Sequence, residues 1–306
     1  MIQSFSPRNA LFLNELDVLQ KRIADTQSQI TSGVRIRSAA DAPDQVNALM
    51  HVNSDLARMD QVQKNLGTVK TEVDTASGTI QTGIKMLDSI ISLGTQATSG
   101  TSNTDSRAVV LQQIQSLQGQ LVHLTSASAG GRYLFSGDDD ANPPYRLNLA
   151  SANGVDQLTT SSATRLVEGP DGLRFSVSMT AQDLFDQRNA DGSAANTNVF
   201  AAVNSLRKAV ADGVDSEITA ALDNLHTAQD HLNVAGSKYG TIQAQVAAAL
   251  DNSSTSQSHY KIRLSEIRDA DLPSSALGLQ QAETSLSAAF SAQSQIPRTS
   301  LFDYLK

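Results

Sequence analysis

Apolar residues near the N-terminus recur with the rhythm of a coiled-coil helix. The positions that step alternately by four and three residues are Phe12, Leu16, Leu19, Ile23, Thr26 and Ile30. Such steps place all of these side chains on one face of a helix. We predict that this helix ends near Gly33, because the loop that follows reaches Pro43, which cannot continue a helix without a break. Helix should resume at about Asp44.

Two further stripes predict a helical hairpin. The first runs through Leu49, Val52, Leu56 and Met59 and, after a shift of one residue, through Val62, Leu66, Val69, Val73, Ala76 and Ile80. A polar segment at residues 98–104 interrupts it. The second stripe follows this break and consists of Val110, Ile114, Leu117, Leu121 and Leu124. Because the break is short, we expect the second helix to return antiparallel to the first.

The pattern then changes to the alternation of short strands. The alternating segments are Arg132–Phe135, Tyr145–Leu149, Thr164–Val167 and Leu173–Met179, and Gly, Asp and Pro clusters separate them. They predict a small β-rich insertion. Residues 136–192 hold eight Asp and one Glu against four Arg, so 4 − 9 gives −5 of the net charge of −8. We therefore expect this part to be solvated and to face outward.

Helical spacing returns towards the C-terminus, from about Asn198. A long stripe that should pack on the hairpin is formed by Ile218, Leu222, Leu225, Leu232, Ala235, Tyr239, Ile242, Val246 and Ala249. The last stripe consists of Leu279, Ala282, Leu286, Ala289, Gln293 and Ile296, and Pro297 ends it. The pattern predicts a mainly α fold, a long antiparallel helical bundle or coiled coil formed by both chain ends, with the β-rich domain inserted.

This pattern divides the chain into five expected segments. They are an N-terminal coiled-coil segment at 1–43, a helical hairpin of a rod at 44–131, a β-rich variable outer domain at 132–192, returning rod helices at 193–262, and a C-terminal coiled-coil segment at 263–306. The two coiled-coil segments should pair with each other.

The two terminal helices form the candidate functional surface. Isolated helices of this length are marginal in water, so they need each other and neighbouring subunits to bury their narrow stripes. The candidate assembly seam consists of Phe12, Leu16, Leu19, Ile23, Ile30, Leu279, Ala282, Leu286, Ala289 and Ile296.

Composition excludes several classes of protein. Cysteine is absent, which excludes disulfide frameworks, thiolate metal sites and thiol nucleophiles. A net charge of −8 disfavours binding to nucleic acid. The sequence has no run of about 18 apolar residues that could insert into a membrane. Its first residues lack a basic region followed by an apolar run, so a cleaved Sec signal is not expected.

Candidate chemical sites are weak. Gly78–Lys85 comes near a phosphate-binding loop, but the lysine stands one place late, no hydroxyl residue follows it and no strand precedes it. His226 and His231 are five residues apart and miss the four-residue spacing of two metal ligands on one helix face. Asp138–Asp140 lacks the alternating ligands of a calcium loop. Because there is also no Gly-x-Ser-x-Gly elbow, we expect no catalytic residue, cofactor or metal.

Several terminal stretches together resemble the signatures of the flagellin superfamily. They are Gln29–Asp41, Ile267–Leu272, Gln280–Ala282, Gln295–Pro297 and Ser300–Leu305. The resemblance covers roughly residues 1–135 and 200–306. It implies an axial structural protein, exported by the flagellar type III system with an export chaperone and located in the extracellular flagellum. Such a subunit would form a homo-oligomeric ring or helical assembly beside hook-associated protein and flagellin subunits.

Two branches of that superfamily remain open. Gly131–Gly137, Pro144-Tyr145 and the ending Leu301–Leu305 are more similar to hook–filament junction proteins, whereas Ala39–Pro43 departs from their usual double-aspartate-proline loop. A filament flagellin is therefore the alternative. Outside the superfamily, a cytoplasmic coiled-coil signalling scaffold would share the heptads without the terminal signatures. A type III needle-tip or translocator protein would also be helical and poor in cysteine.

Overall fold

The computed structural model describes residues 7–98 and 104–294. The chain forms two compact units, of which the terminal one is discontinuous in sequence and the central one is continuous. The terminal unit comprises residues 1–58 and 257–306, and the central unit comprises residues 59–256. The prediction of a mainly α fold with long helices from both chain ends and small β-hairpins in the middle is confirmed.

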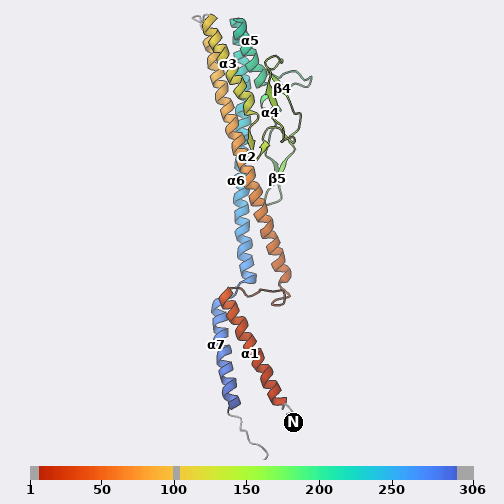
Figure 1. Ribbon diagram of the computed structural model, residues 1–306, viewed down its shortest axis with the longest axis vertical. Helices are drawn as coiled ribbons and strands as arrows, with labels where there is room; N and C mark the ends of the chain where they lie inside the picture. The colour runs from red at the N-terminus through yellow and green to blue at the C-terminus, as the bar shows by residue number, and fades with distance from the viewer. Residues whose placement is uncertain (1–6, 99–103, 295–306) are drawn as a thin grey trace, which may run out of the picture. The chain divides into compact units, whose positions relative to one another are not determined.

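The terminal unit is built around two helices from opposite ends of the chain. Helix α1 (Pro7–Ser32) and helix α7 (Leu272–Ser294) pack side by side (Figure 1). The predicted end of the first helix near Gly33 is confirmed, since the N–H of Gly33 makes the last hydrogen bond of α1, to the Gln29 carbonyl at 2.8 Å. Helix α2 (Val46–Thr98) then begins close to the predicted position.

Backbone hydrogen bonds join the segment after α1 to the segment before α7. The N–H groups of Arg35 and Ile36 donate to the Arg268 carbonyl at 2.8 and 3.1 Å. The Ala270 N–H donates to the Gly33 carbonyl at 2.9 Å. Two stretches that carry the superfamily resemblance, one from each half of the sequence, therefore lie side by side in the terminal unit.

The side chain of Arg35 joins the same two segments. Its guanidinium donates to the Ile267 carbonyl at 2.7 Å and to Gln45 Oε1 at 2.8 Å. The neighbouring Ile36 is buried. Because one guanidinium can donate several hydrogen bonds in a fixed plane, Arg35 holds the loop before α2 and the end of α6 (Asp215–Arg268) together.

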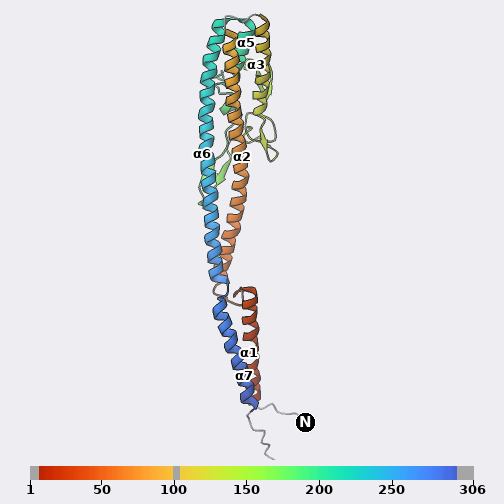
Figure 2. The same ribbon diagram turned by 90° about the vertical axis from the view of Figure 1, so that its left-hand side faces the viewer.

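The central unit contains the predicted helical hairpin and the predicted return helix. Helix α3 (Thr104–Leu124) and the central part of α2 contribute to one core, together with α5 (Val199–Asp212) and α6. Figure 2 shows α2 and α6 side by side over a long distance. Asp74 accepts a hydrogen bond from Gln243 at 2.8 Å, and Asp88 accepts one from Gln229. Since the partner number falls as the aspartate number rises, the two helices run antiparallel.

The β-rich insertion consists of three two-stranded antiparallel sheets and one short helix. The pairs are β1 (Ser128–Ala129) with β2 (Arg132–Tyr133), β3 (Tyr145–Leu147) with β4 (Val155–Gln157), and β5 (Leu166–Glu168) with β6 (Arg174–Ser176). Helix α4 (Ala181–Phe185) follows. The predicted strand segments contain β2, β3 and β6 and overlap β5, whereas β1, β4 and α4 were not predicted.

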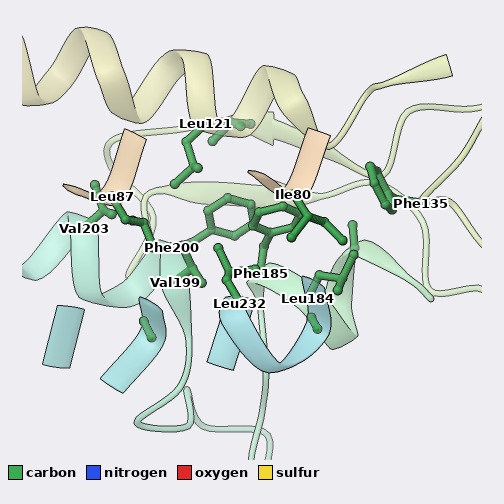
Figure 3. Close-up of a cluster of buried hydrophobic side chains, with 14 of the residues drawn as sticks. Ile80, Leu87, Leu121, Phe135, Leu184, Phe185, Val199, Phe200, Val203 and Leu232 are labelled. Atoms are coloured by element: carbon green, nitrogen blue, oxygen red, sulfur yellow. The ribbon is translucent and has the colours of Figure 1, made fainter. Parts of the chain in front are cut away.

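The insertion shares its core with the helices. In Figure 3, Phe185 of α4 and Phe200 of α5 lie among Ile80 and Leu87 of α2 and Leu121 of α3. The rings of Phe185 and Phe200 stack with centroids 5.8 Å apart. The insertion therefore buries an apolar face against the helices, which net charge could not reveal because it does not show which alternate residues point inward. Its outward position in an assembly stays a prediction.

A buried carboxylate anchors the insertion to the helices. Asp186 is 0% exposed. It accepts hydrogen bonds from the Tyr145 hydroxyl at 3.0 Å, Arg188 Nε at 3.0 Å, Asn198 Nδ2 at 2.7 Å and Asn153 Nδ2 at 3.2 Å. We call these five residues the Asp186 hub. Because Asn198 also caps the N-terminus of α5 through its side-chain oxygen, the hub fixes β3, the loop after it and α5 to one another.

Candidate assembly surface

The structure places the two halves of the predicted seam on the paired terminal helices. Phe12, Leu16, Leu19, Ile23 and Ile30 lie half-buried on α1. On α7, Leu279, Leu286 and Ala289 are half-buried and Ala282 is buried. Ile296 lies outside the described residues. The structure thus brings together the elements that carry nine of the ten seam residues.

The terminal unit has little core of its own. Among the described residues of this unit, the buried apolar side chains are Ile36, Ala42, Val52 and Ala282. The central unit, in contrast, buries large side chains in one continuous cluster, which includes Leu66, Ile80, Phe185 and Phe200. Burial of apolar surface is the main favourable term in folding, so the single chain gives the terminal unit little of that stabilisation.

The terminal unit also exposes large apolar side chains outside the predicted seam. Among the described residues these are Leu11, Leu13, Val18, Met50, Ile262, Leu272, Leu277 and Phe290. Leu11 is 64% exposed, Val18 60% and Phe290 50%. Single exposed apolar residues are ordinary, but so many on a small unit with few buried ones are typical of an interaction surface.

The sequence contained a signal for part of this surface. Leu11 and Val18 are seven residues apart and each precedes a seam residue, Phe12 and Leu19. These two residues belong to a second apolar stripe, which also repeats every seven residues and is displaced from the seam by one position. It makes the apolar face of the helix wider than a two-stranded seam requires. A pair of helices needs only the narrow stripe, so the wider one indicates further partners.

Polar contacts fix the loops beside this surface. Asp41 accepts hydrogen bonds from the backbone N–H groups of Ser38 and Arg37, both at 2.8 Å, and these bonds lower its pKa. Asp269 accepts hydrogen bonds from Ser265 Oγ at 2.7 Å and Arg268 Nε at 2.9 Å, which likewise lower its pKa. Both carboxylates are therefore ionised at neutral pH and close the connections that precede α2 and α7.

The stretches considered for other chemistry have structural roles. Gly78–Lys85 lies inside α2, so it forms no loop that could cradle a phosphate. In the acidic run, Asp138 accepts a hydrogen bond from the Thr164 hydroxyl at 2.8 Å, and Asp140 forms an ion pair with Arg132. His231 Nε2 lies 2.8 Å from the Asp183 carbonyl oxygen and joins α6 to α4.

Residues 7–98 and 104–294 contain neither a candidate metal site nor a candidate membrane-spanning helix. No three His, Cys, Asp or Glu residues in this part of the chain are grouped so that they could hold a metal ion. Among the same residues, no helix combines the length and the apolar character required to cross a membrane.

The fold and this surface define a class of protein. Helices from the two chain ends pair, expose apolar side chains and bury few, as expected of a structural subunit that assembles with other subunits. Models of two regions match the chain: the bacterial flagellin N-terminal helical region over residues 10–140, and the bacterial flagellin C-terminal helical region over residues 220–305. The chain belongs to the bacterial flagellin family. It is a structural component of the flagellum and not an enzyme.

Curated relatives come from both branches of this family. The chain is 26% identical to flagellar hook-associated protein 3 of Escherichia coli (strain K12) over 225 residues, which cover 69% of the chain and 70% of that relative. It is 28% identical to flagellin A of Rhizobium meliloti (strain 1021) over 127 residues, which cover 42% of the chain and only 30% of that relative.

Solved structures share the fold at low identity. A putative flagellar hook-associated protein from Vibrio parahaemolyticus superposes with a TM-score of 0.65 at 17% identity, over 75% of this chain and 100% of that one. Flagellar hook-associated protein 3 from Legionella pneumophila gives a TM-score of 0.61 at 13% identity, over 71% and 98%. At these identities the likeness concerns the fold alone.

Proposed function

We propose that this chain is the subunit that joins the hook to the filament of a bacterial flagellum. The curated match that extends over most of both chains is to a hook-associated protein, whereas the match to a flagellin covers less than a third of that relative. The junction-like stretch Gly131–Gly137 supports the same branch. In this role the protein connects two parts of the flagellum mechanically, and its functional surfaces are those that contact neighbouring subunits.

The proposed mode of assembly rests on one observation, the small number of buried apolar side chains among the described residues of the terminal unit. Copies of the chain bury the seam of α1 and α7, together with Leu11, Val18 and Phe290, against the same unit of neighbouring copies. Repeated head-to-tail contacts of one kind produce a ring if they close and a helical tube if they do not. We propose a homo-oligomer of this kind, with hook-associated protein and flagellin subunits as its axial neighbours.

Assembly outside the cell requires a route of export. We propose that the chain leaves through the flagellar type III system and that a dedicated chaperone holds it before export. A chain without cysteine can cross between redox compartments unchanged, which supports this route. Without a chaperone, the exposed apolar side chains of the terminal unit would promote premature association inside the cell.

Immunogold labelling of isolated flagella tests the proposed position. A junction subunit gives a band at the distal end of the hook, and a strain that carries an unrelated epitope-tagged filament protein gives the control pattern. Label along the whole filament would refute the junction position and favour the alternative, a filament flagellin, which the partial match to flagellin A supports.

A further inference from the structure

The loop between β3 and β4 contains the one Asn-Gly dipeptide of the sequence, Asn153-Gly154. In such a dipeptide the glycine nitrogen can attack the side-chain carbonyl carbon of the asparagine, because glycine has no side chain to obstruct the approach. The new N–C bond closes a succinimide ring and the C–N bond to the amide breaks, which releases ammonia. Water then opens the ring to aspartate or isoaspartate, so the reaction needs only water.

The fold requires glycine at this position. Gly154 has a φ of 77°, a conformation that side chains disfavour. A Cβ atom here would overlap Gln118 Nε2 and lie 3.1 Å from Asn204 Oδ1. Gln118 and Asn204 are both buried, on α3 and α5. Because this loop lies so close to the two helices, only glycine fits at position 154, and the chain keeps a chemically labile Asn-Gly dipeptide there.

Hydrogen bonds hold both reacting groups in the folded chain. Asn153 Nδ2 donates to Asp186 Oδ1 at 3.2 Å. The N–H of Gly154 donates to the Ser151 carbonyl at 3.1 Å, and the Gly154 carbonyl accepts from the Asn148 N–H at 3.0 Å. The attack requires the Gly154 nitrogen to lose its proton and turn towards Asn153, which breaks this turn. Opening of the loop must therefore precede the reaction.

The product would not fit the hub. Deamidation replaces a donor by a carboxylate directed at the buried Asp186, whose one cationic partner within the hub is Arg188. A second negative charge beside a buried one is costly unless it is paired. Isoaspartate also lengthens the main chain of the loop by one carbon atom.

We propose that Asn153 is a self-modification site: the Asp186 hub suppresses its deamidation while the chain is folded, and deamidation, once it occurs, irreversibly loosens the β3–β4 hairpin.

The rate of deamidation in the full chain tests the suppression. Folded protein and protein in urea are incubated at the same mildly alkaline pH, and the peptide that contains Asn153 is followed by mass spectrometry. We expect conversion in urea to be faster by about tenfold or more, because the folded chain reacts only through local opening. Asn148 and Asn189, which precede Leu149 and Ala190, serve as internal controls. Equal rates in both states, or no conversion in urea, would overturn the proposal.

Substitutions test the consequence. Asn153→Asp supplies one product directly, and we expect it to lower the urea midpoint of unfolding. Asn196→Asp, at an exposed turn position, is the matched control and should leave the midpoint unchanged. Asp186→Ala should raise the rate at Asn153 in native buffer towards the rate in urea. If that variant does not fold, the comparison of Asn153→Asp with Asn196→Asp still decides. An unchanged midpoint for Asn153→Asp would refute the loosening.

Discussion

The hydroxyl of Tyr145 donates a hydrogen bond to the buried carboxylate of Asp186 at 3.0 Å, across 41 residues of sequence. Burial of Tyr145 and the negative charge of Asp186 raise the tyrosine pKa well above its ordinary value of 10.0. Tyr145 therefore stays protonated at all ordinary pH values and always has a proton to donate. This bond fastens strand β3 to the segment that follows α4.

Tyr145→Phe should destabilise the central unit by about 1 to 3 kcal/mol, because it leaves a buried acceptor with one donor fewer. Asp186→Ala should cost more, about 3 to 5 kcal/mol, since it strands Arg188 and two asparagine amides. Urea unfolding followed by circular dichroism measures both effects. Tyr260→Phe, at a half-exposed position of α6, is the control. Wild-type stability for both hub variants would mean that the hub does not anchor the insertion.

Substitution of two glycines of α2 by alanine should change the stability of the protein in opposite directions. A Cβ atom at Gly94 would lie 2.8 Å from a Leu222 methyl carbon and 3.0 Å from one of Leu206, so Gly94→Ala should cost about 1 to 3 kcal/mol. At Gly78 nothing lies within 4 Å, and Gly78→Ala should stabilise the monomer by about 1 kcal/mol. Thermal unfolding of the two variants decides; changes of the same sign would contradict the packing described for α2, α5 and α6.

Leu11→Ser and Phe290→Ser should separate assembly from folding. Both side chains are at least 50% exposed in the single chain, so monomer stability should change by less than about 0.5 kcal/mol. Each intersubunit contact should weaken by about 1.5 to 3 kcal/mol, because a large apolar side chain is no longer buried there.

The concentration required for assembly, measured by sedimentation, reports this loss. Leu158→Ser, an exposed position of the central unit, is the matched control. Normal assembly by both terminal-unit variants would remove these residues from the proposed surface.

Two deletions should fail for different reasons. Removal of residues 279–306 exposes Leu16, Leu19, Ile23 and Ile30, a loss of at most about 6 to 12 kcal/mol per subunit, so assembly should fail. The central unit should stay folded, since its core lies elsewhere. Removal of residues 138–185 strips Tyr145 and Phe185 from that core and should unfold the central unit. Circular dichroism and electron microscopy of each variant check this, and a cooperatively folded protein after the second deletion would contradict the shared core.

Acid should weaken the contact between α2 and α6. Hydrogen bonds from Lys70 and Gln243 lower the pKa of Asp74 below its ordinary value of 3.8. The folded chain therefore binds this proton less readily than the unfolded chain. The resulting stabilisation is complete above the ordinary pKa and is lost as the pH falls through the folded one.

Asp74→Asn should accordingly melt at a lower temperature than the wild type at neutral pH and show a shallower decline in acid. Melting temperatures recorded from neutral pH downward measure the difference. Asp251→Asn, at an exposed position of α6, controls for the loss of charge. Parallel acid profiles for Asp74→Asn and the wild type would show that the hydrogen bonds of Lys70 and Gln243 to Asp74 add no stability.

Helices could be predicted because their signal is local. Residues three and four apart meet on one helix face, so the stripe from Ile218 to Val246 reported a buried face before any tertiary contact was known. Asn198 likewise stands immediately before α5, and its side chain accepts a hydrogen bond from the Ala201 N–H at 2.9 Å. A capping residue next to an apolar run is legible in sequence.

The parts that were missed depend on shorter or more distant signals. Strand β4 is only three residues long, although Asn153-Gly154 just before it is a known turn signal. Helix α4 is marked by a capping box of Thr180 and Asp183. The burial of Asp186 could not be predicted from the residues next to it, since its partners Tyr145 and Asn153 precede it and Asn198 follows it at a distance in the sequence. The contacts between subunits remain a prediction for the same reason.

The bond from Arg35 to the Ile267 carbonyl spans 232 residues of sequence. Closing so long a loop is slow and costs entropy before any contact repays it, whereas α2 and α3 are consecutive helices of the chain. The central unit can thus form from one continuous stretch, but the terminal unit cannot begin until residues beyond 267 are free to fold. The topology thereby determines the order in which the two units fold. A chain that emerges from a channel with its N-terminus first completes its assembly surface last.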